Sequence, residues 1–285
     1  MIANPGRAAR RKLISGLFTG ACMLATGVAL VALLLILWSL LTQGLSGINL
    51  DIITKDTSAG GLRNAIVGSV MMCLVAMVFS VVVGILAGTW LAEIGGDTRY
   101  GHTVRFLNDV LLSAPSILVG VFVTTILVNP FGGASGWAGA VALAILATPV
   151  VTRTTEDILN LQPSSLREAS MALGASQFVT VRRVIWKAAG AGLLTGGLLG
   201  FARISGETAP LLHTAGDTQF MHEPWWDIPG MMSNQNASLP VMMYNFALSP
   251  FEDANKLAWA GAVLLAFAVL GINVLGRWLA REKKM

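Results

Sequence analysis

The sequence predicts an all-α, polytopic membrane protein with six transmembrane helices, and three observations support this class. Hydrophobic residues make up 54% of the chain and charged residues only 12%, whereas a soluble domain is about 25% charged. The apolar residues gather in long runs separated by polar, glycine-rich segments. Each of these runs is long enough to cross a bilayer as a helix, which takes about 20 residues. We therefore expect a short cytoplasmic tail, residues 1–12, followed by a single transmembrane domain over residues 13–285.

Six apolar runs define the predicted spans, and they cover residues 13–41, 65–92, 106–128, 137–159, 188–212 and 257–280. The first is longer than the core of a secretory signal and lacks a convincing cleavage site, so we expect it to be retained. The second carries Gly84 and Gly88 at a spacing that lets another helix approach closely. The third contains Pro115, which predicts either a simple kink or a segment that lines a water-filled path.

The distribution of basic residues predicts the orientation. Of the 19 lysines and arginines, 15 lie in the two tails, the 93–105 loop and the region around residues 153–187. By the positive-inside rule, both termini and the 160–187 loop are cytoplasmic and the 213–256 loop is external. The net charge of +4 is thus explained by membrane orientation and does not indicate a nucleic-acid partner. In the external loop, Trp225 and Trp226 are either a docking surface or interfacial anchors.

The 160–187 loop has the pattern of two short helices joined by a tight turn. Ser165 and Glu168 have the spacing of a capping box at the start of the first helix. Gly174 suits the left-handed position that ends it, and Ser176 can cap the second. That second helix would carry Arg182, Arg183 and Lys187 to a membrane surface.

The fifth predicted span carries two charges, Arg203 and Glu207, inside an apolar run. A charge at mid-membrane costs at least about 2.5 kcal/mol, and such residues by default mark ion or substrate pathways. At 100° per residue they share one helix face with a ridge formed by Gly192, Gly196 and Gly200. Two interpretations remain open: a substrate path, or an internal ion pair that only locks helix packing.

Several motifs resemble those of known transporters. The sequence Glu168-Ala169-Ser170, followed by Gly174, resembles the EAA loop of ABC-importer permeases, through which a permease docks onto its ATPase. The stretch from Arg203 to Ala209, RISGETA, is similar to the R-x-x-G-E-T-A signature of phosphate-importer permeases. Stretches around residues 105–117, 148–153 and 239–250 resemble the A-type subunits, the PstA family. One departure is that Trp186-Lys187 stands where the EAA pattern usually has Leu-Pro.

The resemblance implies a type I ABC importer permease fold in the bacterial inner membrane, and import of inorganic phosphate by alternating access. It implies a substrate path at Arg203, Glu207, Thr208, Ser113 and Ser116, and coupling to the ATPase through Glu168, Ala169, Ser170 and Gly174. The implied partners are a second permease (PstC-like), an ATPase dimer (PstB-like), an external phosphate-binding protein (PstS-like) and membrane lipid.

The chain itself is not expected to be an enzyme. It has no G-x-x-x-x-G-K-[ST] loop to hold ATP, no catalytic constellation and no metal-ligand spacing, so we expect no bound cofactor and ATP on the partner. Two alternatives stay open. One is a permease for another oxyanion or solute; the other is a non-transporting scaffold or signalling subunit with a purely structural Arg203/Glu207 pair.

Overall fold

The computed structural model describes residues 5–224 and 226–282, and within these ranges the regular elements are all helical. Three of the long helices contain a wider π-helical turn. The elements are α1 Pro5–Leu45, α2 Leu50–Thr54, η1 Thr57–Ala59, α3 Arg63–Trp90, η2 Leu91–Gly95, α4 Arg99–Ser113, α5 Ser116–Val123, η3 Thr124–Val128, α6 Gly136–Asn160, α7 Ser164–Ala172, α8 Gln177–Thr180, η4 Val181–Ile185, α9 Trp186–Ser205, α10 Ala209–Thr214, α11 Ile228–Ser233, α12 Leu239–Ala247 and α13 Glu252–Glu282.

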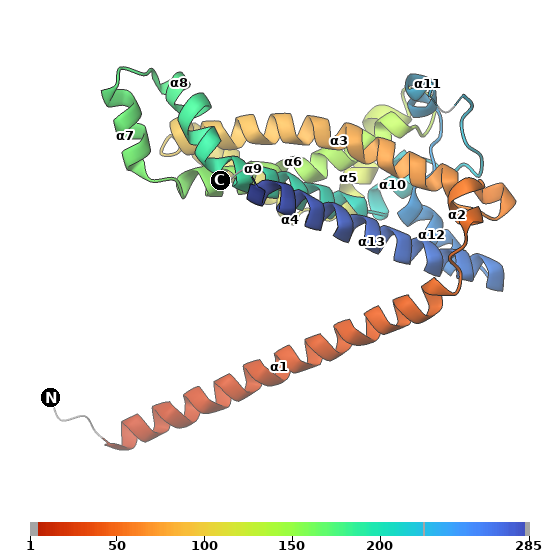
Figure 1. Cartoon of the computed structure of the whole chain (residues 1–285), viewed down its shortest axis with the longest axis horizontal. Coiled ribbons are helices and arrows are strands. Elements are labelled where there is room, and N and C mark those ends of the chain that lie inside the picture. Colours follow the sequence, from red (N-terminus) through yellow and green to blue (C-terminus); the bar gives the residue numbers. More distant parts are fainter. Residues whose placement is uncertain (1–4, 225, 283–285) are drawn as a thin grey trace.

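Five helices are long and apolar enough to cross a membrane, and a bent pair makes a sixth candidate. The five cover Arg10–Leu45, Arg63–Gly95, Gly136–Asn160, Gln177–Ser205 and Glu252–Trp278. Helices α3, α6, α9 and α13 form a bundle, whereas α1 diverges from it (Figure 1). The first helix also begins at Pro5, inside the predicted polar tail. These findings confirm the all-α membrane class.

Helix α6 is the centre of the bundle, because small residues on its neighbours let it approach both of them. A Cβ atom on Gly84 of α3 would lie 2.7 Å from Val151 of α6. One turn later, a Cβ on Gly88 would lie 2.5 Å from the backbone oxygen of Thr152. On α9, Gly192, Gly196 and Gly200 face Ile158, Thr154 and Val151 of α6 in the same way. Both predicted glycine ridges are therefore helix contacts.

The predicted third span is not a single helix. It is broken between α4 and α5, whose axes meet at 100°. Ala114 and Pro115 are both extended, with ψ of 134° and 129°. The ring of a proline disfavours the helical region for the residue before it, which explains why α4 ends at Ser113. The predicted span over 106–128 is therefore a bent pair of helices, and the bend at Pro115 is sharp.

The fifth predicted span also differs at both ends. Its helix begins at Gln177, so the second coupling helix and the span are one continuous rod of 29 residues. It ends at Ser205, and residues 206–208 separate it from α10. Arg203 therefore lies in the last turn of α9, while Glu207 lies in the break. The expectation of one helix over 188–212 was wrong.

The 213–256 segment, expected as a polar external loop, is largely packed structure. It contains α11 and α12, and α12 buries Leu239, Val241 and Met242 against α3 and α13. Leu239 and Met242 form a second apolar core with Ile52 and Leu62 at this end of the molecule, whereas Val241 belongs to the main core. Trp226 is exposed on this segment, and Trp225 lies outside the described residues.

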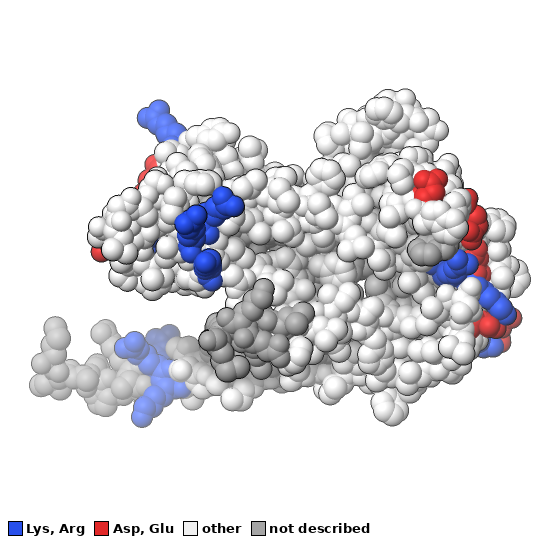
Figure 2. All heavy atoms as spheres, turned by 45° about the horizontal axis from the view of Figure 1, so that its top comes forward, with Lys and Arg blue, Asp and Glu red and all other residues white. Residues whose placement is uncertain are grey.

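Charged side chains gather at the two ends of the molecule, with an uncharged belt between them on the face shown (Figure 2). The end that carries α7 and α8 shows mainly Lys and Arg, and the other end shows both signs. The start of α1 and the end of α13 lie at the same end as α7 and α8 (Figure 1). This arrangement is expected if the uncharged belt lies in lipid and the two charged ends face water.

Candidate functional site

The first candidate site is the ion pair at the break after α9. Arg203 Nη1 lies 2.7 Å from Glu207 Oε1, and the side chains are 49% and 9% exposed. The contact is electrostatic rather than an aligned hydrogen bond, because Oε1 has no hydrogen-bond partner among the described residues. The helix C-terminus favours a cation in its last turn, where Arg203 lies. Arg203 is 17 residues beyond Trp186, which places it about 25 Å along the helix from the basic end.

This arrangement is suited to binding an anion weakly. A guanidinium has five N–H donors, and the described residues occupy only one edge of that of Arg203. Since half of the side chain is exposed, the remaining donors are open to a ligand. The buried carboxylate of Glu207 holds the guanidinium in place and offsets its charge while no anion is present. The glycine ridge of α9 faces α6, whereas the guanidinium of Arg203 is open.

The packing of α5 against α10 indicates where Ser116 lies relative to the break after α9. Gly120 of α5 touches Pro210 of α10, and four residues on, Thr124 donates to the carbonyl of His213 at 3.1 Å. The two helices therefore run in parallel, and one turn earlier on the same face of α5 stands Ser116. This register sets Ser116 level with the Glu207 break.

Two hydroxyls complete the predicted path. Thr208 begins α10 and its side chain makes no capping bond, so the hydroxyl is not committed to the helix start. Ser113 lies on the far side of the α4–α5 break, where its hydroxyl donates to the carbonyl of Val110 at 3.0 Å. Thr208 thus follows Glu207 directly in the chain, the register of α5 and α10 sets Ser116 level with the break, and Ser113 lies before the α4–α5 break.

The second candidate site is the α7–α8 hairpin, which projects beyond the bundle (Figure 1). Gly174 ends α7 with a φ of +83°, as its sequence position predicted. Ser170 is buried and its hydroxyl lies 2.9 Å from that of Thr180, which closes the hairpin. The predicted capping box is absent, because α7 starts at Ser164 and no side chain caps it. Ser176 does stand at the cap of α8, though its hydroxyl makes no capping bond.

The outer face of the hairpin is unusually apolar for a water-facing surface. Glu168 and Ala169 are exposed on it, Met171 is 51% exposed and Leu173 is 89% exposed. Exposing large side chains at the tip of a protruding helix is unfavourable in water, and such patches mark interaction sites. Ser170 and Gly174 shape the hairpin, while Glu168 and Ala169 are presented by it.

Sequence reasoning missed the residues that tie this hairpin to the bundle. Arg167 donates to both carboxylate oxygens of Glu93 in η2, at 2.6 and 3.0 Å. It also donates to the carbonyls of Leu159 and Gln162 at the end of α6. The hydrogen bond to Glu93 raises the pKa of Arg167. The only signal in the sequence was an arginine directly before the Glu-Ala-Ser motif.

Comparison with known proteins identifies the family to which the chain belongs. Residues 81–282 match the family described as "Binding-protein-dependent transport system inner membrane component". The chain is 45% identical to the phosphate transport system permease protein PstA of Haemophilus influenzae and 46% identical to that of Pasteurella multocida, with 96% of each chain covered in both cases. It is 34% identical to the probable PstA of the archaeon Methanocaldococcus jannaschii, over 90% of each chain. The chain belongs to the PstA family of transport permeases.

The fold of this PstA-family chain is also found in a solved importer. The permease in an inward-facing structure of the MetNI methionine ABC transporter superposes with a TM-score of 0.63, covering 78% of this chain and 95% of that chain at 21% identity. This likeness establishes the type I importer permease fold. The family match over residues 81–282 includes both candidate sites and leaves α1 outside.

Proposed function

We propose that this chain is the A-type permease subunit of an ATP-driven importer of inorganic phosphate. Its family membership makes it a transporter component rather than an enzyme. The relatives are named as phosphate transport permeases. The observation that carries the choice of an anion is the Arg203–Glu207 pair, a half-exposed guanidinium held over a nearly buried carboxylate inside an apolar span.

The proposed transport step uses the open edge of Arg203. A passing phosphate accepts charge-assisted hydrogen bonds from the guanidinium, and the hydroxyls of Thr208 and Ser116 supply further donors beside it. Glu207 competes for the same guanidinium, so the affinity for phosphate stays modest. Modest affinity is what transport requires, because the ion must leave the site as well as enter it.

Coupling to ATP hydrolysis uses the α7–α8 hairpin. Its exposed face, with Glu168 and Ala169 and the apolar tip at Leu173, forms the docking surface for an ATPase subunit. Because α8 is continuous with α9, displacing the hairpin moves the rod that ends at Arg203. Closure of the ATPases would therefore tilt α9 and change which side of the membrane the anion site faces.

The remaining assignments complete the proposal. ATP would be bound by a PstB-like ATPase dimer, a PstC-like permease would form the other half of the pathway, and a PstS-like protein would deliver phosphate from outside. The chain would lie in the bacterial inner membrane with both termini in the cytoplasm, since the basic end carries both termini and the hairpin.

Phosphate uptake by vesicles that contain the whole complex tests the proposal. Arg203→Ala should abolish uptake while the complex still assembles, and Arg203→Lys should retain part of it. Arg99→Ala, which removes an exposed arginine at the basic end, is the matched control and should transport normally. Normal uptake by Arg203→Ala, or wild-type uptake of sulfate or molybdate instead of phosphate, would reject the assignment.

A further inference from the structure

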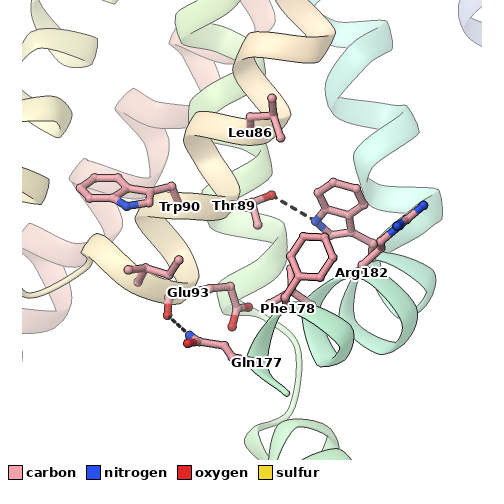
Figure 3. A pocket seen from close by; sticks show the side chains of 10 residues that line it. Leu86, Thr89, Trp90, Glu93, Gln177, Phe178 and Arg182 are labelled. Carbon is pink, nitrogen blue, oxygen red and sulfur yellow. Dashed lines mark hydrogen bonds between the residues drawn. The ribbon is translucent and has the colours of Figure 1, made fainter. Parts of the chain in front are cut away.

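A groove of about 500 Å³ lies at the basic end of the molecule, between the end of α3 and the start of the α8–α9 rod. One wall is formed by Leu86, Thr89, Trp90 and Glu93, and the other by Gln177, Phe178 and Arg182 (Figure 3). Trp186 closes it by donating to the hydroxyl of Thr89 at 3.1 Å. The groove is separate from both the anion site and the outer face of the α7–α8 hairpin.

The groove is polarised along its length. Leu86 and Phe178 contribute apolar walls, and they are 56% and 71% exposed. At the other end lie the polar groups of Gln177 and Glu93, and Arg182 stands beyond Phe178 on the side of the α8–α9 rod. A molecule that filled the groove would therefore need an apolar body and a charged or polar head.

The polar head of the bound molecule would carry a negative charge. The carboxylate of Glu93 is the one acidic group among the lining residues, and Arg167 neutralises it through two hydrogen bonds. Arg182 is exposed and has no ion pair within the described residues. The groove thus offers one uncompensated positive charge, that of Arg182 on the side of the α8–α9 rod.

The apolar end of the groove continues onto the surface of α3. Large apolar side chains stand at every fourth residue along this helix, and each is at least half exposed: Val70, Leu74, Val78, Val82 and Leu86. The row extends over about 24 Å, close to the thickness of the hydrocarbon core. Its next members, Trp90 and Ile94, line the groove itself. An acyl chain lying along this row would lead directly to the groove.

We propose that this groove binds an anionic phospholipid, with its phosphate at Arg182 and an acyl chain along the exposed row of α3. Basic pockets between transmembrane helices on the cytoplasmic side are suited to anionic headgroups. The bound lipid would cover the apolar rim and brace α3 against the start of the α8–α9 rod, where movement of the coupling hairpin enters the membrane. This site is independent of which anion the importer carries.

Brominated lipids, which quench nearby tryptophans, test the proposal on the purified, detergent-solubilised complex. Brominated phosphatidylglycerol should quench tryptophan emission with a lower midpoint than brominated phosphatidylcholine. Because Trp90 and Trp186 both line the groove, replacing both by Phe should remove most of this saturable component. Arg182→Ala should raise the phosphatidylglycerol midpoint about fivefold, the change expected for one basic residue near an anionic surface. Arg182→Lys should preserve the preference.

Arg183→Ala is the matched control, because Arg183 is the adjacent exposed arginine and does not line the groove. Its midpoint should equal that of the wild type. Equal midpoints for the two lipids, or equal shifts in the two arginine variants, would overturn the proposal. So would loss of ATPase subunits from Arg182→Ala with an unchanged lipid midpoint, which would assign the groove to the ATPase interface.

Discussion

Arg167 of α7 and Glu93 of η2 form a two-pronged ion pair that joins the coupling hairpin to the end of α3. The Arg167 Nη2–Glu93 Oε1 distance is 2.6 Å and the Nε–Oε2 distance is 3.0 Å. The carbonyl of Glu93 also accepts a hydrogen bond from Gln177 of α8, at 3.0 Å. One residue of the bundle therefore holds both helices of the hairpin, and force applied to the hairpin reaches α3 as well as α9.

Replacing Arg167 should weaken this connection. In Arg167→Ala the carboxylate of Glu93, which is 6% exposed, loses its partner, and breaking such a pair costs about 3 kcal/mol. We expect a lower melting temperature of the complex and fewer phosphate ions moved per ATP hydrolysed. Arg167→Lys should recover only part of this, since lysine cannot bind both oxygens in the same way. If Arg167→Ala moves as many phosphate ions per ATP hydrolysed as the wild type, the ion pair is not needed for coupling the hairpin to the bundle.

The exposed tip of the hairpin should be needed for ATPase binding. In Leu173→Asp, a charge replaces a side chain that is 89% exposed, so the isolated chain should stay folded. Burying that charge at an interface should weaken ATPase binding by about 2 kcal/mol, or roughly 30-fold. Co-purification of the ATPase with the permease measures this. Phe131→Asp is the control, because Phe131 is 80% exposed and lies in the turn after α5, away from the hairpin.

The close approach of α3 and α6 should depend on Gly88. The added Cβ in Gly88→Ala would lie 2.5 Å from the backbone oxygen of Thr152, so the two helices must separate. Overpacking of this kind costs about 1–3 kcal/mol. The control is Gly190→Ala on α9, where a Cβ meets nothing within 4 Å. Thermal unfolding should show a loss only for Gly88→Ala, and equal melting temperatures would contradict the packing argument.

Removing the charge of Glu207 should strengthen phosphate binding and slow phosphate release. In Glu207→Gln, Arg203 keeps its place but loses the negative charge that offsets it, so phosphate should be held more tightly. We expect a lower KM for uptake together with a lower maximal rate, because release becomes slower. A purely structural pair would instead lower assembly or stability without lowering KM. Initial uptake rates over a range of phosphate concentrations distinguish these results.

The sequence was sufficient to predict the membrane class, the glycine contacts and the hairpin turn, because each depends on local chemistry. Gly84, Gly88 and Gly174 each occupy the position that their spacing predicted. Pro115 predicted a kink in the third span, but not a bend as sharp as 100°. The apolar run continues across Ala114 and Pro115, and hydropathy does not report a change of direction.

The residues of the first candidate site could be chosen from the sequence, but their arrangement could not. Arg203 and Glu207 were chosen because charges in an apolar run are costly. That α9 ends between them follows from Gly206 and from packing of α10 on α5, and it was not predicted. The Arg167–Glu93 pair joins residues 74 positions apart, and no local pattern relates them. Such long-range pairs need the tertiary structure.

The first helix has one further consequence, for the order in which the chain is made. Its main partner in the bundle is α13, the last helix, which it meets where Gly44 and Gly47 lie against Trp259, Val263 and Ala260. Because α1 precedes α13 by more than 200 residues, this contact can form only after nearly all of the bundle has been synthesised. A chain cut short before α13 would leave α1 without that contact.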